Sequence, residues 1–146
     1  MKHEKQVSNL ELSKELKLLG VKQDSLHYYY RTYDEEQGDK QEYINKKWVQ
    51  TYQTEKYELH SIDSEWSGNQ GVHDYSAFSV AELGEMLPKD ILVGEESYGH
   101  LIVMKGYNVW HCVYDGDYRT TSRDTLLANA MAKMLIWCIE NKKVKI

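Results

Sequence analysis

The sequence predicts a single α+β domain spanning residues 1–146, with antiparallel strands, short helices and a long C-terminal helix packed on a hairpin. The length of 146 residues suits one hydrophobic core and is short for two. Hydrophobic residues make up 41% and charged residues 28% of the chain, which is ordinary for a globular protein. Helical periodicity and strand-like alternation follow one another in the order α-β-β-(β)-α-β-β-(β)-α.

The first half begins with one helix and two strands. Asn9 is a good helix cap before residues 10–19, and we expect Gly20 to end that helix in the left-handed conformation. The aromatic run at 26–33 favours a strand. Residues 48–54 alternate in polarity, so we expect a second strand there that pairs with the first.

Other parts of the first half carry weaker signals. The charged segment 34–40 is typical of a turn or loop, and 57–62 is a candidate for a third strand. Both chain ends are polar. We therefore expect frayed tails at 1–8 and 142–146.

Two further helices are expected in the second half. Residues 79–82 form a capping box, which predicts a helix that Pro88 ends. The longest helix is predicted at 123–141, with Ser122 or Asp124 as its cap. Its apolar residues recur at helical spacing, so one face should be buried.

A hairpin is predicted between these two helices. Residues 101–105 and 107–115 are its strands, and the chain should turn at Gly106. The Asp-Gly pair at 115–116 favours a second tight turn, followed by a short strand at 118–121.

Charge and hydropathy narrow the function classes. The net charge is −5 and the isoelectric point about 5.7, whereas nucleic-acid-binding domains are usually basic. The lysines at 142–145 fit a solvated chain end better than a nucleic-acid tail. Residues 1–8 lack the apolar core of a signal peptide, and the longest apolar run, 134–139, is far short of the roughly 20 residues that span a bilayer. We expect a cytoplasmic protein without a membrane segment.

No motif indicates catalysis or a cofactor. The histidines and cysteines do not occur at metal-ligand spacing, and the common nucleotide-binding and acyl-transfer strings are absent. Cys112 and Cys138 are expected to be reduced, buried thiols. Residues 115–117 read Asp-Gly-Asp, which fits a turn better than a cation site. We predict no catalytic, cofactor-binding or metal-binding residue, no cofactor and no enzyme activity.

Tyrosine is unusually abundant. The chain has 12 Tyr and 4 Trp but one Phe, so most aromatic rings carry a polar group. If the strands 26–33 and 48–54 pair, Tyr28, Tyr30, Trp48 and Tyr52 share one face. Two interpretations follow. These rings form the core-facing layer of the sheet, or they form a contact surface for a protein partner.

The last helix has apolar residues beyond one stripe. Ala132, Ile136 and Ile139 lie on an adjoining face. Either the segment 89–99 covers this face, or a second copy of the chain does, which makes a homodimer an open alternative.

Three blocks of sequence resemble a known family. Residues 12–30, 75–88 and 128–141 are similar to small uncharacterised proteins encoded by phages and prophages, often of gut bacteria. The resemblance implies the cytoplasm of an infected bacterium as the setting, and it carries no functional residue. The segments 34–74 and 89–99 depart from the short linkers expected. The tail 101–141 is also similar, in element order alone, to HicB-type antitoxins and to the second half of double-stranded RNA-binding domains.

Three functions are therefore compared. The leading hypothesis is a non-enzymatic phage or prophage accessory protein that binds another protein, such as a host or defence component. The alternatives are a nucleic-acid-associated regulator of the antitoxin type and an enzyme with an unrecognised site. Salt dependence separates the first two, because phosphate contacts weaken steeply as salt rises.

Overall fold

The computed structural model describes residues 5–32, 40–44, 46–51, 56–61, 73–116 and 121–146. It confirms the α+β class and the long C-terminal helix packed on a hairpin. Within these residues the helices are α1 (Leu10–Leu18), α2 (Val80–Met86) and α3 (Leu127–Glu140). The strands are β1 (His27–Thr32), β2 (Lys40–Ile44), β3 (Lys47–Thr51), β4 (Lys56–Ser61), β5 (His73–Ser76), β6 (Asp90–Leu92), β7 (Tyr98–Lys105), β8 (Trp110–Tyr114) and β9 (Thr121–Asp124).

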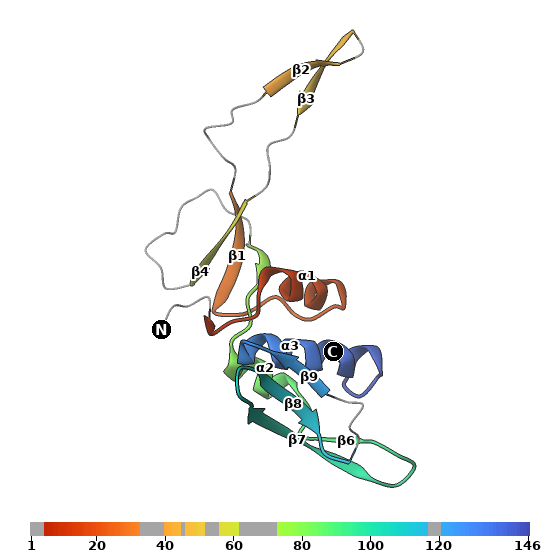
Figure 1. The fold of residues 1–146 in the computed structure, drawn as a ribbon. Helices are drawn as coiled ribbons and strands as arrows, with labels where there is room; N and C mark the ends of the chain where they lie inside the picture. The colour runs from red at the N-terminus through yellow and green to blue at the C-terminus, as the bar shows by residue number, and fades with distance from the viewer. Residues whose placement is uncertain (1–4, 33–39, 45, 52–55, 62–72, 117–120) are drawn as a thin grey trace.

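All strand pairs are antiparallel, and they form three sheets. One sheet has the order β4-β1-β5, a second consists of β2 and β3, and a third has the order β6-β7-β8-β9. Figure 1 shows the β2–β3 hairpin extending away from the two larger sheets, while the three helices lie beside them.

The expected pairing of 48–54 with 26–33 is wrong. Strand β3 pairs with β2, and β1 lies between β4 and β5. The chain turns at Lys46, whose φ of 64° lies in the left-handed region. Strand β2 begins at Lys40, the last residue of the segment expected to be a loop, so β3 has a partner close by in sequence. Pairing with a nearby strand costs less loop-closure entropy than pairing with a distant one.

The caps of α1 and α2 are confirmed. Asn9 accepts a hydrogen bond from the Leu12 N–H at 2.9 Å, and Gly20 follows the helix with a φ of 91°. Ser79 and Glu82 make the reciprocal bonds of the capping box. The helix then ends at Met86, just before Pro88.

The Glu82 carboxylate also fastens a distant segment to α2. It accepts hydrogen bonds from the Ser25 hydroxyl at 3.0 Å and the Leu26 N–H at 3.1 Å. Burial raises the pKa of Glu82, but the hydrogen bonds from Ser79, Leu26 and Ser25 outweigh it, so the net pKa is lowered. One carboxylate thus joins the start of α2 to the chain that enters β1.

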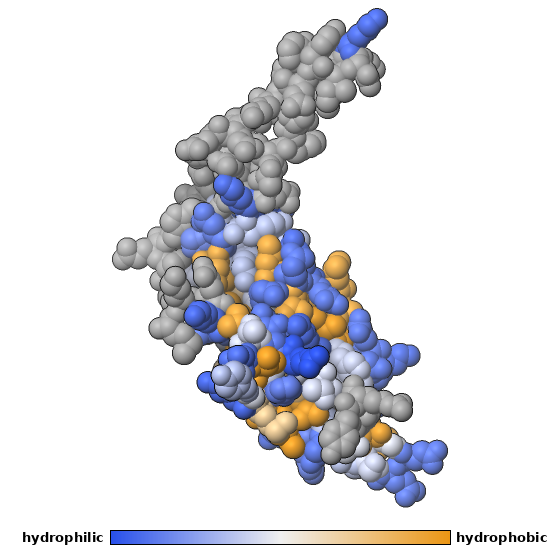
Figure 2. All heavy atoms as spheres, viewed as in Figure 1, coloured by the Kyte–Doolittle hydropathy of each residue, from blue (hydrophilic) through white to orange (hydrophobic). Residues whose placement is uncertain are grey.

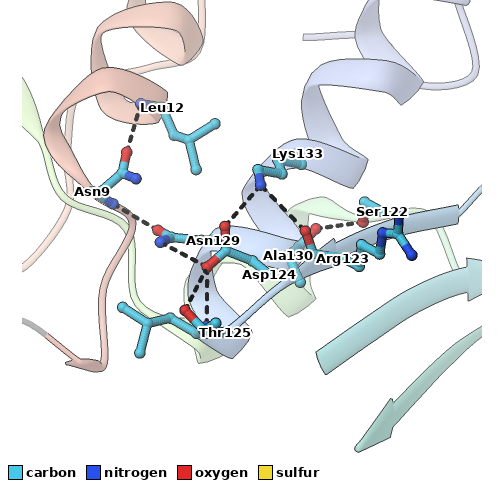
Figure 3. Close-up of polar contacts among 10 residues, drawn as sticks. Asn9, Leu12, Ser122, Arg123, Asp124, Thr125, Asn129, Ala130 and Lys133 are labelled. Carbon is cyan, nitrogen blue, oxygen red and sulfur yellow. Dashed lines mark hydrogen bonds and ion pairs between the residues drawn. The ribbon is translucent and has the colours of Figure 1, made fainter. Parts of the chain in front are cut away.

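The start of α3 differs from the sequence prediction. Residues expected in its first turn form β9 instead, and the helix begins at Leu127. No described side chain caps α3, but Asp124 on β9 binds residues at and near the start of the helix, as Figure 3 shows. Its carboxylate accepts bonds from the Leu126 N–H at 3.0 Å, the Asn129 amide at 3.2 Å and the Lys133 ammonium at 2.7 Å.

Two residues of the segment expected to fray, Val7 and Ser8, are packed, whereas Lys5 and Gln6 are exposed. Val7 and Ser8 have no exposed surface, and Ser8 exchanges backbone and side-chain hydrogen bonds with Phe78. At the other end, Lys143 donates to the Leu92 carbonyl at 2.8 Å, and Val144 packs against the core. The expected short strand at 118–121 begins instead at Thr121, and 117–120 lie outside the described residues.

We predict that Glu82→Ala lowers the free energy of unfolding by about 1–3 kcal/mol, because it removes half of the capping box and the hydrogen bonds that join α2 to Ser25 and Leu26. Since the folded pKa is lowered, this contribution exists above the ordinary pKa of 4.5 and disappears as pH falls through the folded value. Denaturant unfolding at neutral and acidic pH measures both effects. Glu85→Ala on the exposed side of the same helix is the control. An equal loss of unfolding free energy in Glu82→Ala and Glu85→Ala would contradict the role assigned to Glu82.

Candidate protein-binding surface

The four-stranded sheet has one face that the helices cover. Cys112 and Tyr114 on β8 have no exposed surface and belong to the same core as α3. In the register of the hairpin, Leu101 lies opposite Tyr114 and Val103 opposite Cys112. Because neighbouring residues of a strand point to opposite faces, Ile102 and Met104 must lie on the other face of the sheet.

Apolar side chains gather on this outer face, although no described helix packs there. Tyr98 is 66% exposed, Met104 50% and Leu92 40%. Ile102 and Val113 lie opposite each other between them and are half-buried. Figure 2 shows apolar patches among polar ones in the region of β7 and β8. We define the outer face by its apolar residues Leu92, Tyr98, Ile102, Met104 and Val113.

Polar residues interrupt the outer face, because His100 lies between Tyr98 and Ile102 along β7. His100 on β7 pairs with Asp90 on β6, and its backbone N–H donates to the Asp115 carboxylate. The hydrogen bond and charge of Asp90, followed by the charge of Asp115, raise the pKa of His100 above its usual 6.5. On β8, His111 lies between Met104 on β7 and Arg123 on β9.

The face as a whole is therefore suited to contact rather than to chemistry. Protein interfaces combine apolar side chains with polar groups, as this face does. Sequence reasoning missed it, although a signal existed. Leu101 to Met104 are four consecutive apolar residues, which indicates burial on both faces of the strand.

The sequence-predicted contact residues are not brought together. Tyr28 and Tyr30 share a face of β1, where both rings contact His60 with centroid distances of 6.4 and 5.7 Å. Tyr30 is only 5% exposed. Trp48 lies on β3 in another sheet, and Tyr52 lies outside the described residues. Their role as a partner contact remains a prediction. The four residues do not, however, share one face of two paired strands, because β1 and β3 are in different sheets.

The opposite face of the β1 sheet packs against α1. Tyr57 and Tyr75 have their ring centroids 5.7 Å apart, and the Lys14 ammonium lies 5.1 Å from the first of them. The Lys17 ammonium lies 4.9 Å from the Tyr75 ring and donates to the Asp74 carbonyl at 2.6 Å. These contacts hold a helix onto a sheet, as expected of a structural layer.

The predicted self-association residues are used inside the chain. Ala132 is fully buried and Ile136 is 6% exposed, because the sheet, α1 and α2 together surround α3. Ile139 is half-buried and lines a cavity of about 290 Å³ with Val144. Part of the segment 89–99 forms β6. A second copy is therefore not required to bury Ala132 and Ile136.

The thiols are placed for packing. Burial raises the pKa of Cys112 to about 12 and also raises that of Cys138, so neither is readily ionised to a nucleophilic thiolate. Both are free and buried, as the sequence predicted. Among the described residues, no group of His, Cys, Asp and Glu side chains is arranged to hold a metal ion.

Comparison of the chain with protein-family models, characterised proteins and solved structures gave no significant match. In the described part of the chain, each helix is too short or too polar to cross a membrane.

We predict that NMR titration of His100 gives a pKa above 6.5 and that Asp90→Asn moves it down. Because the folded pKa is raised, the pair stabilises the fold below pH 6.5, and this contribution is lost as pH rises through the folded value. Glu140→Gln, at the far end of α3, is the control and should leave the titration unchanged. An unchanged His100 pKa in Asp90→Asn would refute the pairing.

Proposed function

We propose that this protein is a phage or prophage accessory protein that acts, without catalysis, by binding another protein such as a host or defence component. The observation that carries the proposal is the outer face of the β6-β7-β8-β9 sheet. Its apolar side chains are exposed, although Cys112 and Tyr114 on the opposite face of the same sheet are fully buried in the core. The phage setting rests on the three blocks of sequence resemblance.

The exposure of the outer face supports binding because apolar surface in water is unfavourable. Removing apolar surface from water is favourable by about 25 cal/mol per Å², so a partner that covers Tyr98, Ile102 and Met104 gains binding free energy from their burial. Tyr and Met are also enriched in protein interfaces. His100 and Arg123 on the same face offer polar contacts that set the orientation of the partner.

A protein partner fits this face better than nucleic acid does. Nucleic-acid binding needs cations placed to neutralise several phosphates. On the outer face the cationic form of His100 is already paired with Asp90, and the chain as a whole carries a net charge of −5.

We predict that Met104→Glu weakens partner binding by about thirtyfold, which corresponds to about 2 kcal/mol, because it places a charge among the apolar side chains of the interface. Tagged protein is captured from bacteria that carry the phage, the bound protein is identified, and its affinity for each variant is measured. Leu18→Glu is the matched control, since Leu18 is 87% exposed on α1. Folding should be retained in both variants.

Two results would contradict this function. Equal binding by Met104→Glu and the parent protein would exclude the outer face as the contact surface. Capture of nucleic acid that is lost steeply between low and physiological salt would favour the regulator of the antitoxin type instead.

A further inference from the structure

A groove opens on the helix-covered side of the same sheet, at the end of β7. Its volume is about 610 Å³, which is in the range of sites that bind small molecules or short peptide segments. The start of α2 contributes Val80, and the start of α3 contributes Leu126 and Leu127. Trp110 on β8 lies on the same side of the sheet as these helices. The groove is therefore largely apolar.

Two lysines give the groove a positive rim. Lys5 comes from the N-terminal segment and Lys105 from the end of β7, and no carboxylate is among the described lining residues. The Lys105 ammonium lies 5.5 Å from the centroid of the Trp110 ring, which holds it beside the apolar wall. Asp124, which lies opposite Trp110 in the sheet, is engaged with Lys133 and Asn129. In a chain of net charge −5, this local excess of cations favours an acidic ligand.

Beside the groove, β7 has an open backbone edge. Strand β6 pairs with β7 only from Tyr98 to His100. The Leu101 N–H points to the β6 side, where it donates to the Lys89 carbonyl at 2.8 Å. Strand alternation then directs the N–H and C=O groups of Val103 and Lys105 to that same side. No described strand pairs with them there. Val103 is 38% exposed.

From these three features we propose that the groove binds an extended, acidic peptide segment of a partner protein, which adds to β7 as an extra strand. The backbone of the segment pairs with Val103 and Lys105. Its alternate apolar side chains enter the groove, and its carboxylates meet Lys105 and Lys5. Addition of a strand to an open edge is a recurrent mode of peptide recognition, in which backbone bonds give affinity and pockets for alternate side chains give specificity.

This site is distinct from the outer face. The side chains of Lys105 and Trp110 lie on the helix side of the sheet, whereas Met104 points to the opposite side. A peptide in the groove is therefore independent of the partner proposed for the outer face. Failure of one proposal leaves the other standing.

The test is selection from a displayed library of random short peptides against the full chain. We expect enriched sequences in which apolar residues occupy alternate positions and Asp or Glu is over-represented. The affinity of one enriched peptide is then measured for each variant, and amide shifts in the NMR spectrum locate the binding site. Enrichment of basic sequences, or of none, would overturn the proposal.

Val103→Pro tests the open edge. Proline removes the outward N–H but leaves the β7–β8 hydrogen bonds, because those involve the even-numbered residues of β7. We expect binding to weaken by about tenfold or more. Val103→Ala shortens the same side chain and keeps the N–H, so it should bind much more tightly than Val103→Pro. Equal affinity of these two variants would exclude strand addition.

Lys105→Glu tests the charge of the groove, and we expect it to weaken binding of the acidic peptide by about tenfold. Lys142→Glu changes the net charge equally at the opposite end of α3 and should have no such effect. Light scattering distinguishes a second occupant. If the chain forms dimers that Val103→Pro and Lys105→Glu abolish, a second copy fills the groove and the peptide proposal fails.

Discussion

The structure depends on the burial of α3, which is apolar on almost every side. Nine of its residues are buried: Ala128, Asn129, Ala130, Met131, Ala132, Met134, Leu135, Ile136 and Cys138. A helix of this kind must be surrounded. The β6-β7-β8-β9 sheet covers one side, and α1 and α2 cover the others. Because every described helix is used in this way, none remains for the second face of the sheet, and its apolar residues stay exposed.

Polar contacts fix how the covering elements meet α3. The Asp124 carboxylate joins the last strand to the helix. The Asn129 side chain donates to this carboxylate through its amide nitrogen, and its amide oxygen accepts a hydrogen bond from the backbone N–H of Asn9 at 2.9 Å. Asn9 in turn caps α1. Glu82 likewise joins α2 to a distant segment, because its carboxylate accepts a hydrogen bond from the Leu26 N–H, just before β1. Residues far apart in sequence are thus held by single side chains at helix ends, where unpaired backbone groups would otherwise be costly.

Sequence reasoning succeeded where the signal is local. Ser79 with Glu82, and Asn9 with Gly20, each determine a helix within a few residues. It failed where the answer depends on distant partners. Strand β2 has the sequence Lys-Gln-Glu-Tyr-Ile, and its charged residues are not typical of a strand. The residues near Trp48 do not indicate which strand pairs with β3. The exposure of Met104 was equally hidden, because a sequence shows that a strand is apolar on both faces but not that one face lacks a cover.

The open edge of β7 must satisfy two opposite demands. An unpaired strand invites pairing with other copies of the chain, and natural proteins prevent this with short edges or with charged residues such as lysine. Lys105 at the end of the edge serves that purpose, because two copies paired there bring two ammonium groups into one small interface. The same charge attracts an acidic strand. A single lysine therefore disfavours self-pairing and favours a different partner, which is how specificity arises from a difference between two affinities.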